Sequence, residues 1–212
     1  MTFDQKRLNY IIKPYEDEIL YGQIARFLSH TLSRRMSSSL LELFNRTNYI
    51  ATIDLPSHLD ELFKNCYHRI VPSVEAMIDR YTLYPFYHSF LRVYKREIIL
   101  KGMKSGSGSR IHVTAGINTS FVQRIRYPKF CPQCVSEMRS ENGEAYWKRV
   151  HQIPGILVCP VHNAFLIEYT PSVSELSYSK FLTAENVREE SGSIALNKNS
   201  MLLMVSRWLE DS

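Results

Sequence analysis

Apolar residues recur every three or four positions through the first hundred residues, the spacing that places side chains on one face of a helix. The clearest case is Ile19, Leu20, Ile24, Phe27 and Leu28. The acidic run 16–18 precedes them, where a helix dipole favours negative charge. The pattern predicts an amphipathic helix over about residues 16–28.

Serine and proline signals predict the next helices. Ser39 with Glu42, and Ser57 with Asp60, have the spacing of a capping box, and Ser73 follows a proline ahead of another helical pattern. That helix is interrupted at Pro85, after which residues 86–100 are predicted to form a further helix. Short helices in this order fit a helix-turn-helix-like domain over residues 1–101, and equally any small helical bundle.

Two stretches interrupt the apolar pattern. Residues 102–109, GMKSGSGS, combine glycine and serine as flexible loops do, and we expect a flexible basic connection over 102–125. Residues 171–198 are polar and poor in large apolar side chains, so they are predicted to be a linker. An apolar stripe over 201–209 predicts a last helix within the segment 171–212.

The most specific pattern lies between these stretches, in residues 126–170. Cys131 and Cys134, and again Cys159 and His162, are separated by two residues, each pair with a proline in its turn. Two such turns supply the four ligands of a tetrahedral Zn²⁺ site. A redox CxxC pair or a disulfide is the alternative, but the first does not need the second turn and the second needs an oxidising compartment. Four protein ligands leave no position for water or substrate, so we expect one structural zinc ion and no enzymatic activity.

The expected fold is mainly α, with the helical domain followed by a small α+β Cys3His zinc-finger module. Within the module we expect a helix over 136–148 with a break near Gly143, and strands over 156–158 and 165–169. Trp147 is assigned to the core of the module. The fourth cysteine, Cys66, is predicted to be a buried residue outside the metal site.

Composition narrows the class of protein. The chain has 212 residues, 44% of them hydrophobic and 22% charged, which are ordinary globular values. It has no apolar run of about 18 residues as a membrane helix requires, and no signal-peptide core, so we expect a cytoplasmic protein without membrane contact. The net charge of +5 suits an anionic partner.

Basic residues gather around the first cysteine pair. We hypothesise that they contact the phosphates of double-stranded DNA, although charged runs are more commonly solvated faces. The residues are Arg124, Arg126, Lys129, Lys148 and Arg149.

Several segments together resemble the TniQ/TnsD family of transposon target-selection proteins, and are most similar to its TnsD branch. In addition to the two cysteine-containing turns, the matching segments are DEILYGQIAR at 17–26, LPSHL at 55–59, YTLYPFY at 81–87 and GEAYW at 143–147. The resemblance implies that Cys131, Cys134, Cys159 and His162 are the zinc ligands. Many relatives carry a second pair of turns, and here no cysteine follows Cys159.

What the resemblance implies is a non-catalytic adaptor that marks a DNA target and recruits the AAA+ ATPase TnsC of the same transposon. TnsD-like members bind an attachment site directly, and TniQ-like members can act with a CRISPR effector complex. TnsD-like proteins are longer than this chain, which resembles an N-terminal portion or a short TniQ. By family analogy the N-terminal helices are expected to bind TnsC. The alternative function is a zinc-stabilised protein-protein interaction scaffold without direct DNA binding.

Overall fold

The computed structural model describes residues 12–31, 36–106, 108–117, 125–178 and 181–188. Short helices dominate these residues. They are α1 (Leu20–His30), α2 (Met36–Phe44), α3 (Leu59–Asn65), α4 (Val74–Tyr81), α5 (Tyr84–Ser89), α6 (Val93–Ser105), α7 (Ile111–Thr114), α8 (Pro132–Asn142) and α9 (Val173–Tyr178). Single 3-10 turns occur at Tyr67–Arg69, Gly108–Arg110, Val150–Gln152 and Ala184–Asn186.

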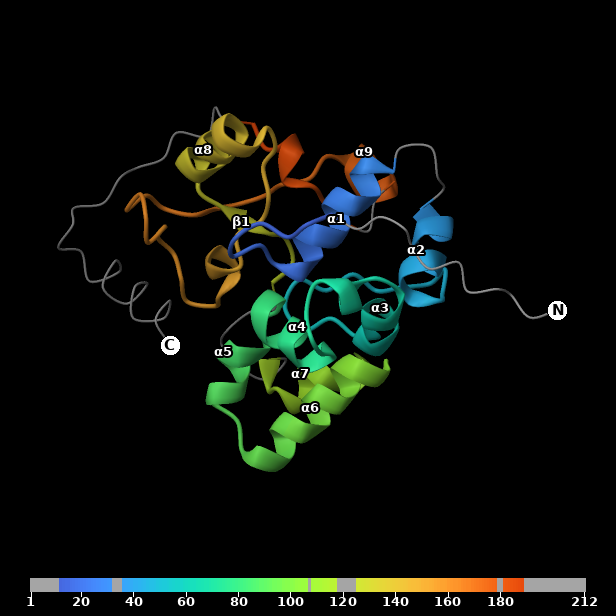
Figure 1. The fold of residues 1–212 in the computed structure, drawn as a ribbon. Coiled ribbons are helices and arrows are strands. Elements are labelled where there is room, and N and C mark those ends of the chain that lie inside the picture. The colour runs from blue at the N-terminus through green and yellow to red at the C-terminus, as the bar shows by residue number, and fades with distance from the viewer. Residues whose placement is uncertain (1–11, 32–35, 107, 118–124, 179–180, 189–212) are drawn as a thin grey trace.

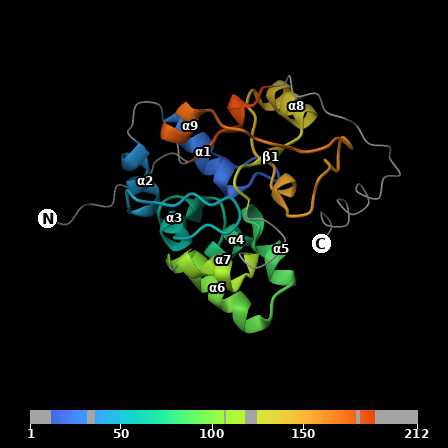
Figure 2. The same cartoon turned by 180° about the vertical axis from the view of Figure 1, so that it is seen from behind.

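Two short strands complete the described structure. β1 (Lys129–Phe130) pairs antiparallel with β2 (Ile167–Glu168), with Lys129 opposite Glu168. Figure 1 shows α3 to α7 in the lower half of the molecule and α8, α9 and β1 in the upper half, and the view from behind in Figure 2 shows the same division. The predicted class, mainly α with a small α+β module, is confirmed.

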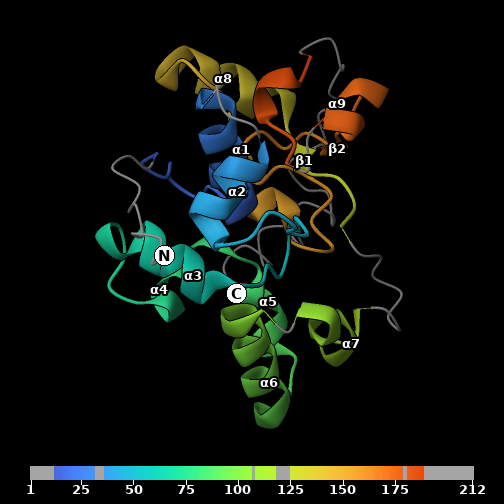
Figure 3. The same cartoon turned by 90° about the vertical axis from the view of Figure 1, so that its right-hand side faces the viewer.

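Helix α1 lies in the upper half of the molecule, with α8 and α9, in all three views (Figures 1 to 3). It begins at Leu20, four residues later than predicted, and every residue of Leu20–Phe27 is buried. Asp17 takes a left-handed backbone conformation with φ of 53°, which turns the chain before the helix. Glu18 consequently points into the protein, where it is fully buried, instead of lying in the first helical turn.

The serine signals differ in their outcome. Ser73 caps α4, because its hydroxyl accepts a hydrogen bond from the backbone N–H of Ala76 at 3.1 Å. Ser39, predicted to start a helix, lies inside α2 and is buried. Residue His58, and not Ser57, precedes α3, with a left-handed φ of 61° and no side-chain cap. A capping-box spacing alone therefore did not locate these two helix starts.

Residues 86–100 form parts of two helices instead of one. Pro85 lies in the first turn of α5, where a missing backbone N–H costs nothing. The second helix, α6, continues to Ser105 through the buried Gly102, and ends at Gly106 with φ of 93°. The glycine-serine stretch is thus helical over its first four residues, which corrects the prediction of a flexible loop from 102. Residues 118–124 of the predicted connection lie outside the described residues.

The main hydrophobic cluster extends from Ile12 to Val187 and takes side chains from both halves of the molecule. Phe181, Leu182 and Val187 are buried in it, and the Trp147 indole N–H donates to the Leu182 carbonyl at 2.7 Å. The prediction of a polar linker is therefore wrong over 181–187, where a few apolar residues in a polar stretch are sufficient for docking. The helix predicted over 201–209 lies outside the described residues.

Trp147 and Cys66 are each 1% exposed, as the sequence predicted for core residues. Among the described residues, no helix combines the length and the apolar character needed to cross a membrane.

Candidate metal centre

The first cysteine pair lies at the start of α8. Cys131 is the N-cap residue, Pro132 occupies the first turn, and the Val135 N–H donates to the Cys131 carbonyl at 3.1 Å. The helix therefore begins between the two cysteines, earlier than the predicted 136, and ends at Gly143 with φ of 76°, as the glycine suggested. This start directs the Cys131 and Cys134 sulfurs to one side of the helix N-terminus.

The second pair lies in a tight turn. The Cys159 N–H donates to the Ala164 carbonyl at 2.8 Å, and the Asn163 N–H donates to the Cys159 carbonyl at 2.9 Å. Asn163 has φ of 56°, a left-handed conformation that asparagine tolerates. A bridge between Val158 and Phe165 closes the base of the turn. His162 is thereby turned back toward Cys159. The strand predicted over 165–169 is present in shorter form as β2 (Ile167–Glu168), whereas residues 156–158 contribute a single bridge instead of the predicted strand.

The four side chains meet with their ligand atoms within 4.8 Å of one another. His162 Nδ1 lies 3.2, 3.6 and 3.7 Å from the sulfurs of Cys134, Cys131 and Cys159, and the Cys134 and Cys159 sulfurs are 3.6 Å apart. Ligand atoms of a regular tetrahedron with metal bonds of 2.0–2.3 Å are separated by about 3.3–3.8 Å. The donor set and these four distances are therefore compatible with a tetrahedral Zn²⁺ ion.

Further groups orient this donor set. His162 Nε2 lies 2.8 Å from a Glu137 carboxylate oxygen, which fixes the ring so that Nδ1 faces the sulfurs. The buried His151 places Nε2 3.9 Å from the Cys134 sulfur, and burial lowers the pKa of His151 to about 3. The Cys134 and Cys159 thiols, hydrogen-bonding to Cys131, lower the pKa of the Cys131 thiol. Sequence reasoning missed Glu137 and His151, although a histidine between the two cysteine pairs was a visible signal.

Cys66 takes no part in the cluster. Its thiol donates to the Leu62 carbonyl at 3.1 Å, and burial raises its pKa to about 12. A protonated, buried thiol is a poor metal ligand. The three remaining cysteines and His162 fill the four positions of a tetrahedron, so the centre can hold a metal as a structural element.

A buried ionic network joins α1 to the segment between the two turns. Arg26 is 1% exposed, and its guanidinium donates to Glu18 at 2.8 Å and to Glu144 at 2.6 Å. Tyr15 stacks on Tyr146 with ring centroids 4.7 Å apart, and its hydroxyl donates to Glu144 at 3.0 Å. Burial raises the pKa of Glu18 to about 7, against the opposing effect of Arg26.

The backbone strengthens this connection. The Ile19 N–H donates to the Trp147 carbonyl at 3.1 Å, and the Arg149 N–H donates to the Asp17 carbonyl at 2.6 Å. The Asp17 carboxylate accepts from the Val150 N–H at 3.0 Å. Because α1 is tied to the metal-binding segment in this way, the segment is not an independently attached finger.

The predicted DNA-contacting residues differ in their surroundings. Arg126 is exposed, with its guanidinium 5.4 Å from the centre of the Tyr127 ring, whereas Arg124 lies outside the described residues. The Lys129 ammonium donates to the Ile153 and Ile156 carbonyls at 3.4 and 2.8 Å, and burial lowers its pKa to about 8. Lys129 therefore holds the module together instead of facing solvent.

Lys148 and Arg149 are half-buried neighbours that line one cavity together with the acidic residues Glu16 and Asp17. Arg149 Nε lies 3.3 Å from an Asp17 carboxylate oxygen. The structure thus brings the four candidate metal ligands together, but it does not gather the four described basic residues into one exposed patch.

Comparison with known proteins accounts for this combination of a helical body and a Cys3His centre. The TniQ family model matches residues 10–166, a range that includes α1 and all four candidate ligands. The chain belongs to the TniQ family. It is also 28% identical over 153 residues to the transposon Tn7 transposition protein TnsD of Escherichia coli, covering 72% of this chain and 30% of that protein.

This TniQ chain therefore spans less than a third of the length of the curated relative that it matches. The matched range, residues 10–166, includes α1 and the segment between the two cysteine-containing turns, which the buried ionic network joins to α1. The family resemblance inferred from the sequence is confirmed.

Proposed function

We propose that this TniQ protein is a non-catalytic target-selection adaptor of a DNA transposon, which contacts target DNA and recruits the AAA+ ATPase TnsC. The observation that carries the proposal is the match of the family model across both the helical body and the metal centre. A structural Zn²⁺ ion would hold the two turns together, and the buried network would make the module and the body a single rigid platform.

The DNA contact is proposed for the exposed basic residues near the first turn. Arg126 is exposed at the surface, and Lys148 is half-exposed. Such residues bind backbone phosphates and release counterions, which makes DNA affinity fall as salt increases. We leave Lys129 out of this contact, because its ammonium is bound to two backbone carbonyls.

Reversing both charges, with Arg126→Glu and Lys148→Glu, is expected to weaken binding to duplex DNA. The loss of two phosphate contacts should also reduce the slope of log affinity against log salt by about two. The measurement is a fluorescence-anisotropy titration of zinc-loaded protein at several salt concentrations. The control is Arg80→Glu with Lys101→Glu, two exposed residues on α4 and α6 that change the net charge equally.

Equal affinities and slopes for the two double variants would refute the proposed contact. If the unmodified chain showed no salt-dependent binding to DNA at all, the alternative function, a zinc-stabilised protein scaffold, would be favoured instead.

The contact with TnsC is proposed for the exposed side of α6 and the turn before it. Phe90, Val93, Tyr94 and Ile98 are 68%, 66%, 55% and 49% exposed, and Figure 3 shows α6 at the end of the molecule away from α8. Clustered apolar side chains at the surface are typical of protein-binding sites. The family analogy pointed to the N-terminal helices, but α1 is a core helix, so deleting it would disturb the fold.

The variant Tyr94→Asp with Ile98→Asp is expected to reduce TnsC association at least tenfold while leaving DNA affinity and thermal stability unchanged. Tyr94 is 55% exposed and Ile98 is 49% exposed, so the two substitutions remove little packing from the folded state. A pull-down with purified TnsC measures the association. The same change at Leu157 and Val161, exposed residues near the second turn, is the control. Equal retention of TnsC by both variants would exclude α6.

A further inference from the structure

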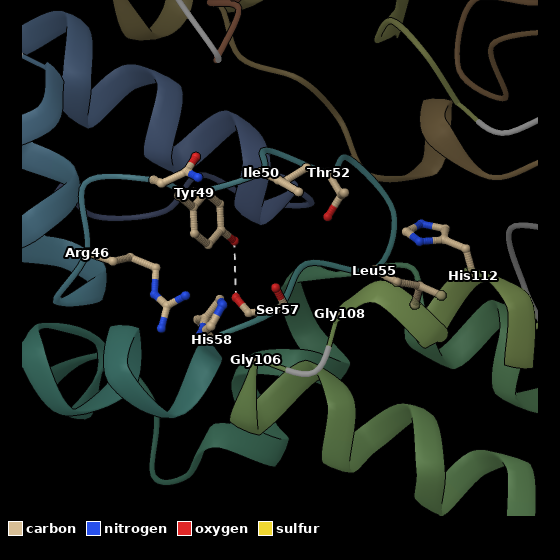
Figure 4. Close-up of a pocket in the computed structure, with 11 residues that line it drawn as sticks. Arg46, Tyr49, Ile50, Thr52, Leu55, Ser57, His58, Gly106, Gly108 and His112 are labelled. Atoms are coloured by element: carbon tan, nitrogen blue, oxygen red, sulfur yellow. Dashed lines mark hydrogen bonds between the residues drawn. The ribbon is translucent and has the colours of Figure 1, made fainter.

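A second polar cavity lies in the other half of the molecule, away from the metal centre. It is formed by the connection between α2 and α3 and by the junction of α6 with α7, and its volume is about 460 Å³ (Figure 4). Arg46 and His58 lie side by side at one end, and His112 lies at the opposite end. Neither the family resemblance nor the metal site accounts for this cavity.

The lining carries positive charge and hydrogen-bond donors but no carboxylate. Arg46 is exposed and extends along the cavity, next to the imidazole of His58. Burial lowers the pKa of His58, and the positive charge of Arg46 lowers it further. The buried Asp54 is not among the lining residues, and its carboxylate is 2.9 Å from His112 Nε2. The negative charge of Glu61 acts on the pKa of His58 in the opposite direction to Arg46. A neutral His58 imidazole can donate one hydrogen bond to an anion that the Arg46 guanidinium binds.

One donor in the lining has no partner. The Thr52 hydroxyl oxygen is buried, and it is the single buried side-chain nitrogen or oxygen without a hydrogen bond in the part of the chain that the structure describes. Leaving such a group unsatisfied costs stability, so these groups are rare and commonly mark a site where a ligand or water binds. Thr52 lines the same cavity as Arg46 and His58.

The backbone holds these groups in a fixed arrangement. His58 has a left-handed φ of 61°, and Gly106 opposite it has φ of 93°. A Cβ atom at Gly106 would lie 2.0 Å from His58 Cε1, so only glycine allows the chain to pass so close to the imidazole. At Gly108 a Cβ atom would lie 3.0 Å from the Ser57 hydroxyl oxygen. The two glycines thus keep this wall of the cavity free of side chains.

We propose that this cavity binds a phosphate group, carried by a nucleotide or by a nucleic acid backbone, with Arg46 and His58 holding the oxygens and the Thr52 hydroxyl donating to one of them. Guanidinium groups favour phosphate because they donate in a fork that matches its oxygens. The volume falls in the range of pockets that hold small ligands such as a nucleotide. This inference goes beyond the proposed function and involves no residue of the metal module or of the α6 contact.

The test measures binding of inorganic phosphate, AMP and a short DNA duplex to the zinc-loaded chain by calorimetry. Arg46→Gln and His58→Asn are each expected to weaken phosphate or AMP binding about tenfold, the effect of losing one charge-assisted hydrogen bond. Asparagine is chosen because it tolerates the left-handed backbone at residue 58. Arg80→Gln, an exposed arginine on α4, is the matched control and should bind as the unmodified chain does.

Thr52→Val separates binding from folding. The hydroxyl has no partner in the free protein, so valine should leave the melting temperature unchanged or raise it, while phosphate binding weakens several-fold. Preference for AMP over the duplex would identify a nucleotide as the source of the phosphate, and competition by the duplex would identify a backbone. Absence of phosphate and AMP binding at millimolar concentrations, or equal affinities for Arg46→Gln and Arg80→Gln, would overturn the proposal.

Discussion

Replacing Cys134 with alanine is expected to abolish metal binding and to prevent stable folding of the segment from β1 to β2. Cys134 is 1% exposed, and its sulfur lies 3.2 Å from His162 Nδ1 and 3.6 Å from the Cys159 sulfur. Structural zinc contributes about 10–16 kcal/mol to small zinc-binding domains, as much as the entire stability of a typical domain. Metal content by mass spectrometry and a thermal melt measure both effects.

Cys66→Ala provides the matched control, because Cys66 is equally buried but belongs to the core outside the cluster. It should retain one zinc ion per chain and lose the packing of one sulfur atom and its hydrogen bond to the Leu62 carbonyl, about 1–2 kcal/mol together. A chelator should reproduce the effect of Cys134→Ala in the unmodified protein and in Cys66→Ala. Stoichiometric zinc in Cys134→Ala would contradict the assignment of this residue as a ligand.

Arg26→Met is expected to destabilise the protein by about 3–5 kcal/mol, the effect of leaving a buried charge without its partner. The guanidinium is the group that binds both Glu18 and Glu144, and Glu18 is fully buried. Urea unfolding at pH 7 measures the loss. The double variant Glu18→Gln with Arg26→Met should recover much of it, because no buried carboxylate then remains at residue 18.

The loss in Arg26→Met should depend on pH with a predictable sign. Burial already raises the pKa of Glu18 to about 7, and removal of Arg26 raises it further above its unfolded value. A raised pKa means that the folded state binds more protons than the unfolded state, so stability falls as pH increases through this range. The variant should therefore be less destabilised at pH 5 than at pH 8. An equal loss at both values, or none, would contradict the role given to the network.

The cluster of four candidate metal ligands could be predicted from sequence because each pair is local. Each turn needs two residues between its ligands, as in Cys131–Cys134 and Cys159–His162. The chain has one further cysteine, Cys66, so few other ligand sets were possible. The Gly143 break and the Ser73 cap are local for the same reason, since a helix end depends on a few neighbouring residues.

The remaining features depend on partners distant in sequence. Glu18 resembles a helix-dipole residue, and its true role depends on Arg26 and on Glu144, 118 residues further on from Arg26. In the sequence Lys129 resembles a surface cation, but in the structure its ammonium donates to the carbonyls of Ile153 and Ile156. Local periodicity cannot reveal such tertiary contacts, and these contacts decide which charges are exposed.

In the proposed function, this TniQ chain connects target DNA with TnsC. The direct measurement is co-sedimentation of purified TnsC with duplex DNA, carrying either the transposon attachment site or a random sequence, with and without the zinc-loaded chain. The chain is expected to increase TnsC retention on DNA, and Tyr94→Asp with Ile98→Asp is expected to remove the increase. Retention of TnsC that is identical with and without the chain on both duplexes would contradict it.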